Sequence, residues 1–211
     1  MVSVVIPAND EMNSIGDVIQ GCKRYCEEII VVDDGSTDET ARVSREHGAR
    51  VIQNGVKLGI VKSTEIGFKS ASGNIVVTLD ADGQHDPAVI PIITKPIVEG
   101  AADLVLGIRV EARPTSERIL AKIIGLRVKC VDPGTGCRAL RAELARNMHL
   151  WGFCLCGSLV LEAYRQAARI VEVPIRIRPR IYGKSHWSPL SKVKVHLTQA
   201  CLLLFQVAKG D

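Results

Sequence analysis

The sequence contains few aromatic residues and little net charge. Eight of its 211 residues are Phe, Tyr or Trp, and 27 basic residues are nearly balanced by 23 acidic ones, for a formal net charge of +4. Proteins that bind single-stranded nucleic acid stack bases on aromatic side chains, and DNA-binding domains are usually strongly basic. Because this chain has neither feature, we expect no nucleic-acid partner.

Segments that cross or target membranes are also missing from the sequence. It has no run of about 20 apolar residues, which is the length that a membrane-spanning helix needs. Residues 1–7 lack the basic stretch that opens a secretory signal peptide. The seven cysteines include no C-x-x-C pair, which predicts reduced thiols rather than a zinc site. We therefore expect a cytoplasmic protein.

Charge is distributed unevenly along the chain. Residues 1–39 include nine acidic and two basic residues, whereas residues 174–211 include seven basic residues and one acidic residue. An acidic segment can bind a metal ion or sugar hydroxyls, and a basic one can bind phosphates or an anionic surface. Two solvated surfaces of opposite sign would give the same pattern.

Short runs rich in Val and Ile alternate with segments of helical periodicity. The predicted strands are residues 2–8, 28–33, 50–53, 74–79 and 103–108. The predicted helices are residues 13–26, a helix that starts at a Ser36–Glu39 capping box and stops near Gly48, and residues 60–71 and 87–99. Such repeated strand–helix units predict an α/β fold with a mostly parallel central sheet and helices on both faces.

The second half of the chain is less regular. We expect helices at residues 116–128, 155–168 and 190–207, a loop at 132–136 and a strand at 170–178. The sequence contains no internal repeat and no linker, which favours one compact unit.

Acidic residues follow three of the predicted strands. Asp10-Glu11 follows the first strand, Asp33-Asp34 ends the second, and Asp80 and Asp82 follow the fourth. Ligands of parallel α/β sheets bind outside the carboxyl ends of the strands. We therefore expect these three clusters to converge at one edge of the sheet.

The segment Asp80-Ala81-Asp82-Gly83-Gln84 fits a hard divalent cation. In an extended turn, residues two apart point the same way, so Asp80, Asp82 and Gln84 can share one side. Their oxygens suit Mg²⁺ or Mn²⁺. His85 is either a further ligand or a hydrogen-bonded loop residue.

Glycine-rich phosphate loops are absent. The first strand–helix turn, residues 7–11, has no glycine, whereas a dinucleotide-binding fold needs G-x-G-x-x-G there. Gly183-Lys184-Ser185 matches only the end of a P-loop. The sequence therefore favours an acidic, metal-based phosphate site.

An ordered series of motifs spans residues 2–187. It comprises IPANDE (6–11), VVDDGSTD (31–38), LDADGQHDP (79–87), GIR (107–109), DPGTGCR (132–138), EVPI (172–175) and RIYGKSH (180–186). In this order the motifs resemble those of family 2 glycosyltransferases with the GT-A fold. Within that family the chain is most similar to the polyprenyl- or dolichyl-phosphate hexose synthases.

The resemblance implies a site for a nucleoside diphosphate sugar. Its implied donor-binding residues are Pro7, Asn9, Glu11, Asp34, Asp80, Ala81, Asp82, Arg109, Arg180 and Lys184. The implied metal ligands for Mg²⁺ or Mn²⁺ are Asp80, Asp82 and Gln84. Asp34 would accept a hydrogen bond from the base, the two arginines would lie near phosphates, and Lys184 would belong to a closing loop.

The resemblance also implies an enzyme that transfers a hexose, with inversion, to a polyprenyl (dolichyl) phosphate. Asp80, Asp82 and Asp132 are then the candidate catalytic residues. A sugar hydroxyl acceptor would need Asp132 as a general base, whereas an ionised lipid phosphate would need it only to position groups. Asp132 could also simply cap the loop before Thr135.

The resemblance divides the chain into a catalytic domain, residues 1–187, and a C-terminal amphipathic helix, residues 188–211. That helix would pack on the domain or lie at the cytoplasmic surface of a membrane. Lys192 and Lys194 precede its apolar run, residues 201–205, and a basic and apolar helix suits a membrane surface.

Several positions depart from the family pattern, which leaves alternatives. Asn9 stands where an aromatic Tyr is usual, the segment between Arg109 and Asp132 is short, and an acid usual within residues 153–158 is missing. The alternatives are a soluble transferase acting on a sugar or protein hydroxyl, and a catalytically weak nucleotide-sugar-binding partner module. The retained Asp80 and Asp82 favour an enzyme.

Overall fold

The computed structural model describes residues 1–111, 113–180, 182 and 189–208. Its centre is a seven-stranded sheet with the order β3-β2-β1-β4-β6-β5-β7. The strands are β1 Val2–Ala8, β2 Glu28–Asp33, β3 Arg50–Gln53, β4 Ile75–Thr78, β5 Leu104–Arg109, β6 Arg138–Arg141 and β7 Ile170–Ile175. Only β6 runs antiparallel to its neighbours, so the predicted α/β architecture with a mostly parallel sheet is confirmed.

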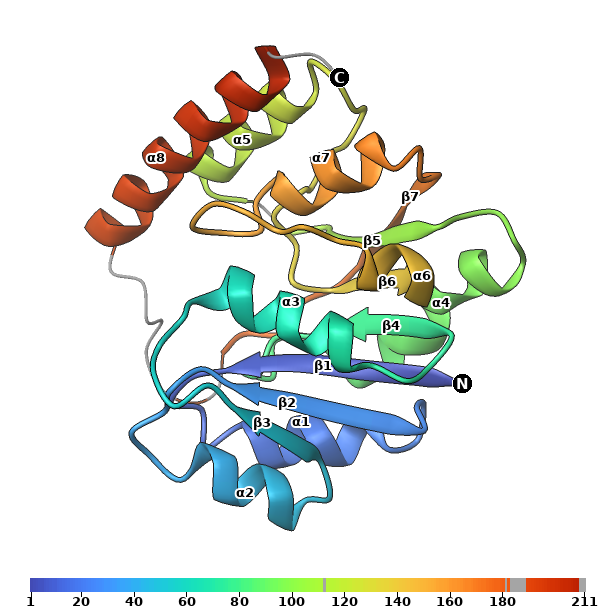
Figure 1. Cartoon of the computed structure of the whole chain (residues 1–211), viewed down its shortest axis with the longest axis vertical. Coiled ribbons are helices and arrows are strands. Elements are labelled where there is room, and N and C mark those ends of the chain that lie inside the picture. The colour runs from blue at the N-terminus through green and yellow to red at the C-terminus, as the bar shows by residue number, and fades with distance from the viewer. Residues whose placement is uncertain (112, 181, 183–188, 209–211) are drawn as a thin grey trace.

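Helices cover both faces of this sheet (Figure 1). They are α1 Ile15–Cys22, α2 Thr40–Glu46, α3 Ile60–Ser70, α4 Ile90–Val98 after a 3₁₀ turn η1 Pro87–Val89, α5 Thr115–Ile124, α6 Ala142–Arg146, α7 Ser158–Arg165 and α8 Pro189–Ala208. Helices α1, α2 and α4 lie on one face, and α3, α5, α6, α7 and α8 lie on the other.

Alternation along the strands creates a separate core on each face. On β1, Val5 shares a core with Phe68 of α3, whereas Val4 and Ile6 share the other core with Ile15 of α1. Successive side chains of a strand point to opposite faces, so a strand buried on both faces must be apolar throughout. This explains the continuous Val and Ile runs of β1 and β2.

Helix α8 packs beside α5 at one end of the molecule (Figure 1). Its Leu203 and Val207 are buried in the same core as Leu120 and Ile124 of α5. The opposite face of α8 exposes apolar side chains, among them Val193, Leu197, Cys201 and Leu204. Within the described residues, no helix has both the length and the apolar character to span a bilayer.

Two local features differ from the sequence predictions. The capping box is wrong: α2 begins at Thr40, and the Ser36 hydroxyl accepts a hydrogen bond from the Asp10 amide instead. Strand β6 and helix α6 were not predicted. Both elements are short. Strand β6 is recognised only by its antiparallel pairing with β4 and β5, which the sequence alone does not show.

Asp103 connects the start of β5 to its neighbours β6 and β7. Its carboxylate accepts hydrogen bonds from Nε and Nη2 of Arg169, both at 2.9 Å, and from Nε of Arg141 at 2.8 Å. The hydrogen bonds from Arg169, and then those from Arg141, hold the pKa of Asp103 well below its usual range. This carboxylate therefore stabilises the sheet in its ionised form.

Asp103→Asn should lower the free energy of unfolding by about 1–2 kcal/mol at neutral pH, because the arginine partners are partly solvated. A carboxylate whose pKa is lowered by folding contributes its full stabilisation at pH values above its unfolded-state pKa of about 4. That stabilisation is lost as the pH falls from there through the folded-state pKa. In urea unfolding, the difference from wild type should be constant from about pH 5 to 8 and shrink below about pH 4.

Glu99→Gln, in an exposed ion pair with Lys95, is the matched control and should cost less than about 0.5 kcal/mol. An equal loss in both variants, or a loss for Asp103→Asn that is undiminished in acid, would contradict this account.

Candidate functional site

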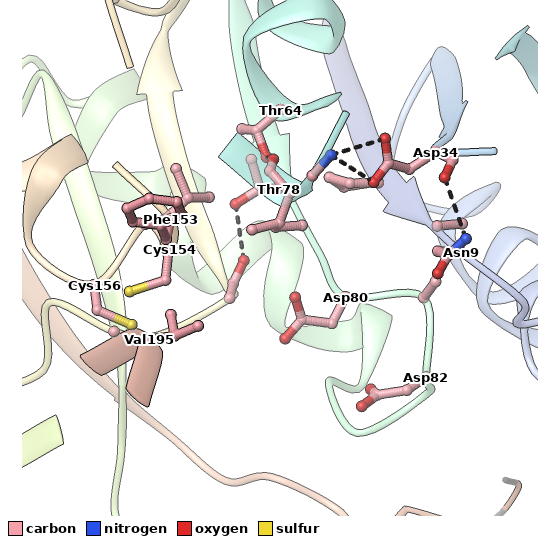
Figure 2. A pocket seen from close by; sticks show the side chains of 18 of the residues that line it. Asn9, Asp34, Thr64, Thr78, Asp80, Asp82, Phe153, Cys154, Cys156 and Val195 are labelled. Carbon is pink, nitrogen blue, oxygen red and sulfur yellow. Dashed lines mark hydrogen bonds between the residues drawn. The ribbon is translucent and has the colours of Figure 1, made fainter. Parts of the chain in front are cut away.

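A pocket of about 690 Å³ opens at the carboxyl ends of β1, β2 and β4. The predicted residues that line it are Pro7, Asn9, Glu11, Asp34, Asp80, Ala81, Asp82, Gln84 and Arg180. In Figure 2, Asn9 and Asp34 lie at one end and Phe153, Cys154 and Cys156 at the other, with Asp80 and Asp82 between them. The three acidic clusters therefore meet at one edge of the sheet.

Asp34 is buried and holds the loop that forms one wall of the pocket. Its carboxylate accepts hydrogen bonds from the amides of Leu58 and Gly59 at 2.8 and 2.9 Å, and from the Ser63 hydroxyl at 2.9 Å. The Asn54 side chain donates a further hydrogen bond at 3.0 Å. Through these hydrogen bonds, Asp34 fixes the position of residues 54–63 beside the pocket.

Asn9 lines this end of the pocket and is hydrogen-bonded on both sides of its amide. Its Nδ2 donates to the backbone oxygen of Asp34 at 3.2 Å, and its Oδ1 accepts from Nζ of Lys57 at 2.6 Å. Lys57 also lines the pocket and was not predicted. Asn9 and Lys57 therefore present an amide and an ammonium group to the pocket. A Tyr at position 9 would instead present an aromatic ring on which a base could stack.

Asp80 lies in the middle of the pocket, immediately beyond β4. Its carboxylate contacts Nε2 of the buried His85 at 3.2 Å. Burial would raise the pKa of Asp80, but the His85 contact and the nearby guanidiniums of Arg138 and Arg109 lower it. A Cβ at Gly136 would overlap the Asp80 carboxylate, so a larger residue there would displace that carboxylate. Asp80 is therefore held ionised and in place.

Asp82 is more protected than Asp80 and is paired with an arginine. Its Oδ2 accepts from Arg180 Nη1 at 3.1 Å, and Arg180 Nη2 donates to Glu11 Oε1 at 2.5 Å. Burial and then the Asp80 carboxylate raise the pKa of Asp82, against the hydrogen bond from the Gln84 amide and the Arg180 charge. Arg180 thus bridges two carboxylates that would otherwise repel each other.

The chain after β7 crosses over the loop that carries Asp82. The Arg178 amide donates to the Gln84 carbonyl at 2.7 Å, and Ile177 forms an antiparallel bridge with His85. Arg178 also pairs with Asp86. These contacts bring the basic C-terminal segment onto the acidic edge of the sheet.

The carboxylates at this edge fit a divalent cation. Burial and then the Asp80 carboxylate raise the pKa of Asp82, and Arg180 places a cationic group between Asp82 and Glu11. Carboxylate oxygens are the preferred ligands of Mg²⁺ and Mn²⁺. Asp80 and Asp82 would hold such an ion, whereas the Gln84 amide nitrogen donates to the Arg178 carbonyl at 3.3 Å.

Arg109 and Asp132 are paired with each other, and the pocket lining, as far as the chain is described, leaves both out. Arg109 donates from Nε and Nη2 to both Asp132 oxygens, at 2.8 and 2.7 Å. Its Nη2 also donates to Glu117 at 2.7 Å, and Glu117 accepts from Lys192 of α8 at 2.8 Å. This network joins β5, the 132–136 loop, α5 and α8.

The network changes the interpretation of two predicted residues. Burial would raise the pKa of Asp132, which is 1% exposed, but the Arg109 hydrogen bonds lower it. A carboxylate held in this way fits the positioning role and not that of a general base. Arg109 is likewise neutralised by its partners rather than directed at the donor pocket. Lys184 lies outside the described residues.

Sequence reasoning missed the pocket residues contributed by the second half of the chain. They are Glu117, Gly134, Gly136, Arg138, Phe153, Cys154, Leu155, Cys156, Ser191, Lys192, Val195 and His196. Arg138 is buried and leaves its Nε without a hydrogen-bond partner in the described part of the chain. Arg138 and Gly136 both belong to the DPGTGCR motif, which therefore contained a usable signal. The sequence contained no comparable signal that residues of α8 line the pocket.

Asp34→Asn should destabilise the protein by roughly 1–3 kcal/mol, because an amide nitrogen would replace one of the two buried acceptor oxygens. Hydrogen exchange at the Leu58 and Gly59 amides should accelerate more than exchange elsewhere. Exposed Asp17→Asn, in the first turn of α1, is the control and should shift stability by less than about 1 kcal/mol. Unchanged exchange at both amides in Asp34→Asn would refute this role.

Comparisons with known proteins identify the family of the chain. The chain matches the glycosyl transferase family 2 model over residues 3–144. A dolichol-phosphate mannosyltransferase of Pyrococcus furiosus is 30% identical over 208 residues, which cover 87% of this chain and 58% of that protein. An undecaprenyl-phosphate 4-deoxy-4-formamido-L-arabinose transferase of Edwardsiella ictaluri is 28% identical, covering 92% and 65%. The chain thus spans less than two thirds of the length of both relatives.

Solved structures give the same result for the fold. Glucosyl-3-phosphoglycerate synthase from Mycobacterium tuberculosis, in complex with Mn²⁺, UDP-glucose and phosphoglyceric acid, is 25% identical with a TM-score of 0.84. The match covers 99% of this chain and 80% of that one. It confirms the predicted GT-A fold. With the family match over most of its length, the chain belongs to glycosyl transferase family 2.

Proposed function

We propose that this protein transfers a hexose from a nucleoside diphosphate sugar to a polyprenyl phosphate, with Mg²⁺ or Mn²⁺ as cofactor. The observation that carries this proposal is one pocket in which Asp80 and Asp82 converge with Arg138 and Arg180. Transfer of a hexose between two phosphorylated substrates needs charge neutralisation at both phosphates. Carboxylates that can hold a cation, together with guanidiniums that can bind phosphate, can supply it.

The donor would occupy the pocket with its base toward Asn9 and its diphosphate toward the Asp80–Asp82 loop. Asp80 and Asp82 would hold the cation, which supplies charge neutralisation to the leaving diphosphate. Arg180, which now bridges Asp82 and Glu11, would be released to bind a phosphate once those carboxylates have another cation. The name of the mycobacterial synthase complex with Mn²⁺ and UDP-glucose supports this donor class.

Arg138 is the best-placed residue for the acceptor phosphate. It lines the pocket, is 3% exposed, and keeps an unpaired Nε within the described residues. A buried cation with a free donor favours an anionic ligand. The acceptor oxygen would attack the anomeric carbon as the bond to the diphosphate breaks, with inversion. An ionised phosphate needs no general base, which agrees with the pairing of Asp132 to Arg109.

Helix α8 supports a lipid acceptor. It lines the pocket with Lys192, Val195 and His196, and its outer face exposes Leu197 and Leu204. A helix that is apolar outside and basic near its start can lie in the interface of a membrane. The names of the relatives from Pyrococcus and Edwardsiella, which cite dolichol and undecaprenyl phosphate, favour the same class. We propose a peripheral placement of α8 on the cytoplasmic surface of a membrane.

A soluble phosphorylated acceptor is the second candidate, favoured by the likeness to glucosyl-3-phosphoglycerate synthase across the whole chain. Radiolabelled UDP-glucose, GDP-mannose and other nucleotide sugars, incubated with Mn²⁺, separate the two candidates. Label recovered in the organic phase with polyprenyl phosphate supports the first, and label on 3-phosphoglycerate supports the second. No transfer to either acceptor with any donor would leave the partner-module alternative.

Asp82→Asn should lose Mn²⁺-dependent nucleotide binding, by at least about tenfold in Kd or about 1.4 kcal/mol, because one anionic ligand disappears. Isothermal titration with UDP and GDP, in Mn²⁺ and in EDTA, measures the effect. Asp17→Asn is the control, because Asp17 is an exposed carboxylate of α1 that does not line the pocket as described. Equal binding by wild type and Asp82→Asn in Mn²⁺ would contradict the metal assignment.

Leu197→Ser combined with Leu204→Ser should weaken binding to anionic lipid vesicles by about tenfold or more, since each apolar side chain buried in lipid contributes roughly 1–2 kcal/mol. Val98→Ser is the control, because Val98 is 73% exposed on α4, on the other face of the sheet. Vesicle sedimentation gives the partition coefficients. If both variants bind vesicles like wild type, the membrane-facing role of α8 is wrong.

A further inference from the structure

Two cysteines and a histidine meet at the end of the pocket that faces α8. Cys154 and Cys156 precede α7, and His196 lies on α8, forty residues later. One ligand atom from each, Sγ, Sγ and a ring nitrogen, lies within 4.8 Å of the other two. Cys154 and His196 are buried and Cys156 is partly buried. Figure 2 shows both cysteines across the pocket from Asp80 and Asp82.

The histidine is oriented as a metal ligand would be. Its Nδ1 lies 2.8 Å from the Ser116 hydroxyl of α5, and its Nε2 lies 3.9 Å from the Cys156 sulfur. A metal-bound histidine usually uses its second ring nitrogen for a hydrogen bond, which fixes the ring and the tautomer. Ser116 supplies that partner here and leaves Nε2 directed toward the thiols.

A glycine lies beside the thiols on one side of the pocket. Cysteine binds a metal ion as the thiolate. The pocket wall beside Cys156 is Gly134, where an added Cβ would lie 3.5 Å from the sulfur, so nothing bulky fills that side.

We propose that Cys154, Cys156 and His196 form a zinc site with an open fourth position toward the pocket. Two thiolates and an imidazole select a soft or borderline ion over the Mg²⁺ or Mn²⁺ suited to Asp80 and Asp82. Three protein ligands plus a water or substrate atom is the arrangement of zinc sites that bind ligands. The site lies in the same pocket as the proposed transfer site, but metal binding by these three residues does not require the transfer reaction. The sequence analysis did not predict this site because the two cysteines have C-x-C rather than C-x-x-C spacing and the histidine is distant in the sequence.

The test uses the full-length protein, purified with reductant, stripped with chelator and titrated with Co²⁺ or Zn²⁺. Wild type should bind one Co²⁺ with thiolate charge-transfer bands and the intense visible bands of tetrahedral cobalt, and one Zn²⁺ should displace it. Cys154→Ser, Cys156→Ser and His196→Asn should each lose the thiolate cobalt spectrum or weaken binding by about tenfold or more. Ser116→Ala should weaken Zn²⁺ binding roughly ten- to a hundredfold with the ligands intact.

Matched controls separate this site from other metal binding. Cys201→Ser, at an exposed cysteine of α8, and His149→Asn, at an exposed histidine, should bind like wild type. Asp82→Asn should keep the cobalt spectrum even if it loses Mn²⁺-dependent nucleotide binding, so the two proposals can fail separately. The inference is overturned if reduced wild type shows no thiolate–cobalt bands, or if intact mass shows a Cys154–Cys156 disulfide that persists in reductant. Retention of zinc by all three ligand variants would also overturn it.

Discussion

Repulsion among the carboxylates gathered at the ends of β1, β2 and β4 is the constraint on which the site depends. Glu11, Asp34, Asp80 and Asp82 all line one pocket, and each has a polar or basic partner. Asp34 is satisfied by backbone amides and hydroxyls, Asp80 by His85, and Glu11 and Asp82 share Arg180. Without such partners, the buried charges of Glu11 and Asp34 would cost several kcal/mol each.

This constraint explains the uneven charge of the chain. The acidic N-terminal segment forms one side of the pocket, and the basic segment after β7 returns across it to place Arg178 and Arg180 on the Asp82 loop. The two segments are therefore complementary parts of one site rather than two separate solvated surfaces. Helix α8 follows that segment, and Lys192 ties it to Glu117 and so to the Arg109–Asp132 pair. The end of the pocket beside α8 is thus built by the part of the chain least regular in sequence.

How much of this the sequence could reveal depends on whether a residue's partners are local. The strands at 2–8 and 28–33 follow from largely apolar runs, and their ends place two of the acidic clusters correctly. Strand β6 is four residues long and depends on pairing with distant strands, so no local pattern marks it. The pairing of Arg109 with Asp132 and the approach of His196 to Cys156 join residues 23 and 40 positions apart. Sequence motifs identified Arg109 and Asp132 but not Cys156 or His196. In both cases the contacts between the residues are set by the fold.

The most direct test of the account is a crystal of the protein grown with Mn²⁺ and the nucleoside diphosphate that binds it, with anomalous data collected at the manganese edge. The account predicts a manganese peak within bonding distance of the Asp82 carboxylate, the Arg180 guanidinium moved from Asp82 to a phosphate oxygen, and the base beside Asn9. Nucleotide bound with no manganese at Asp82, or with Arg180 still bridging Asp82 and Glu11, would contradict it.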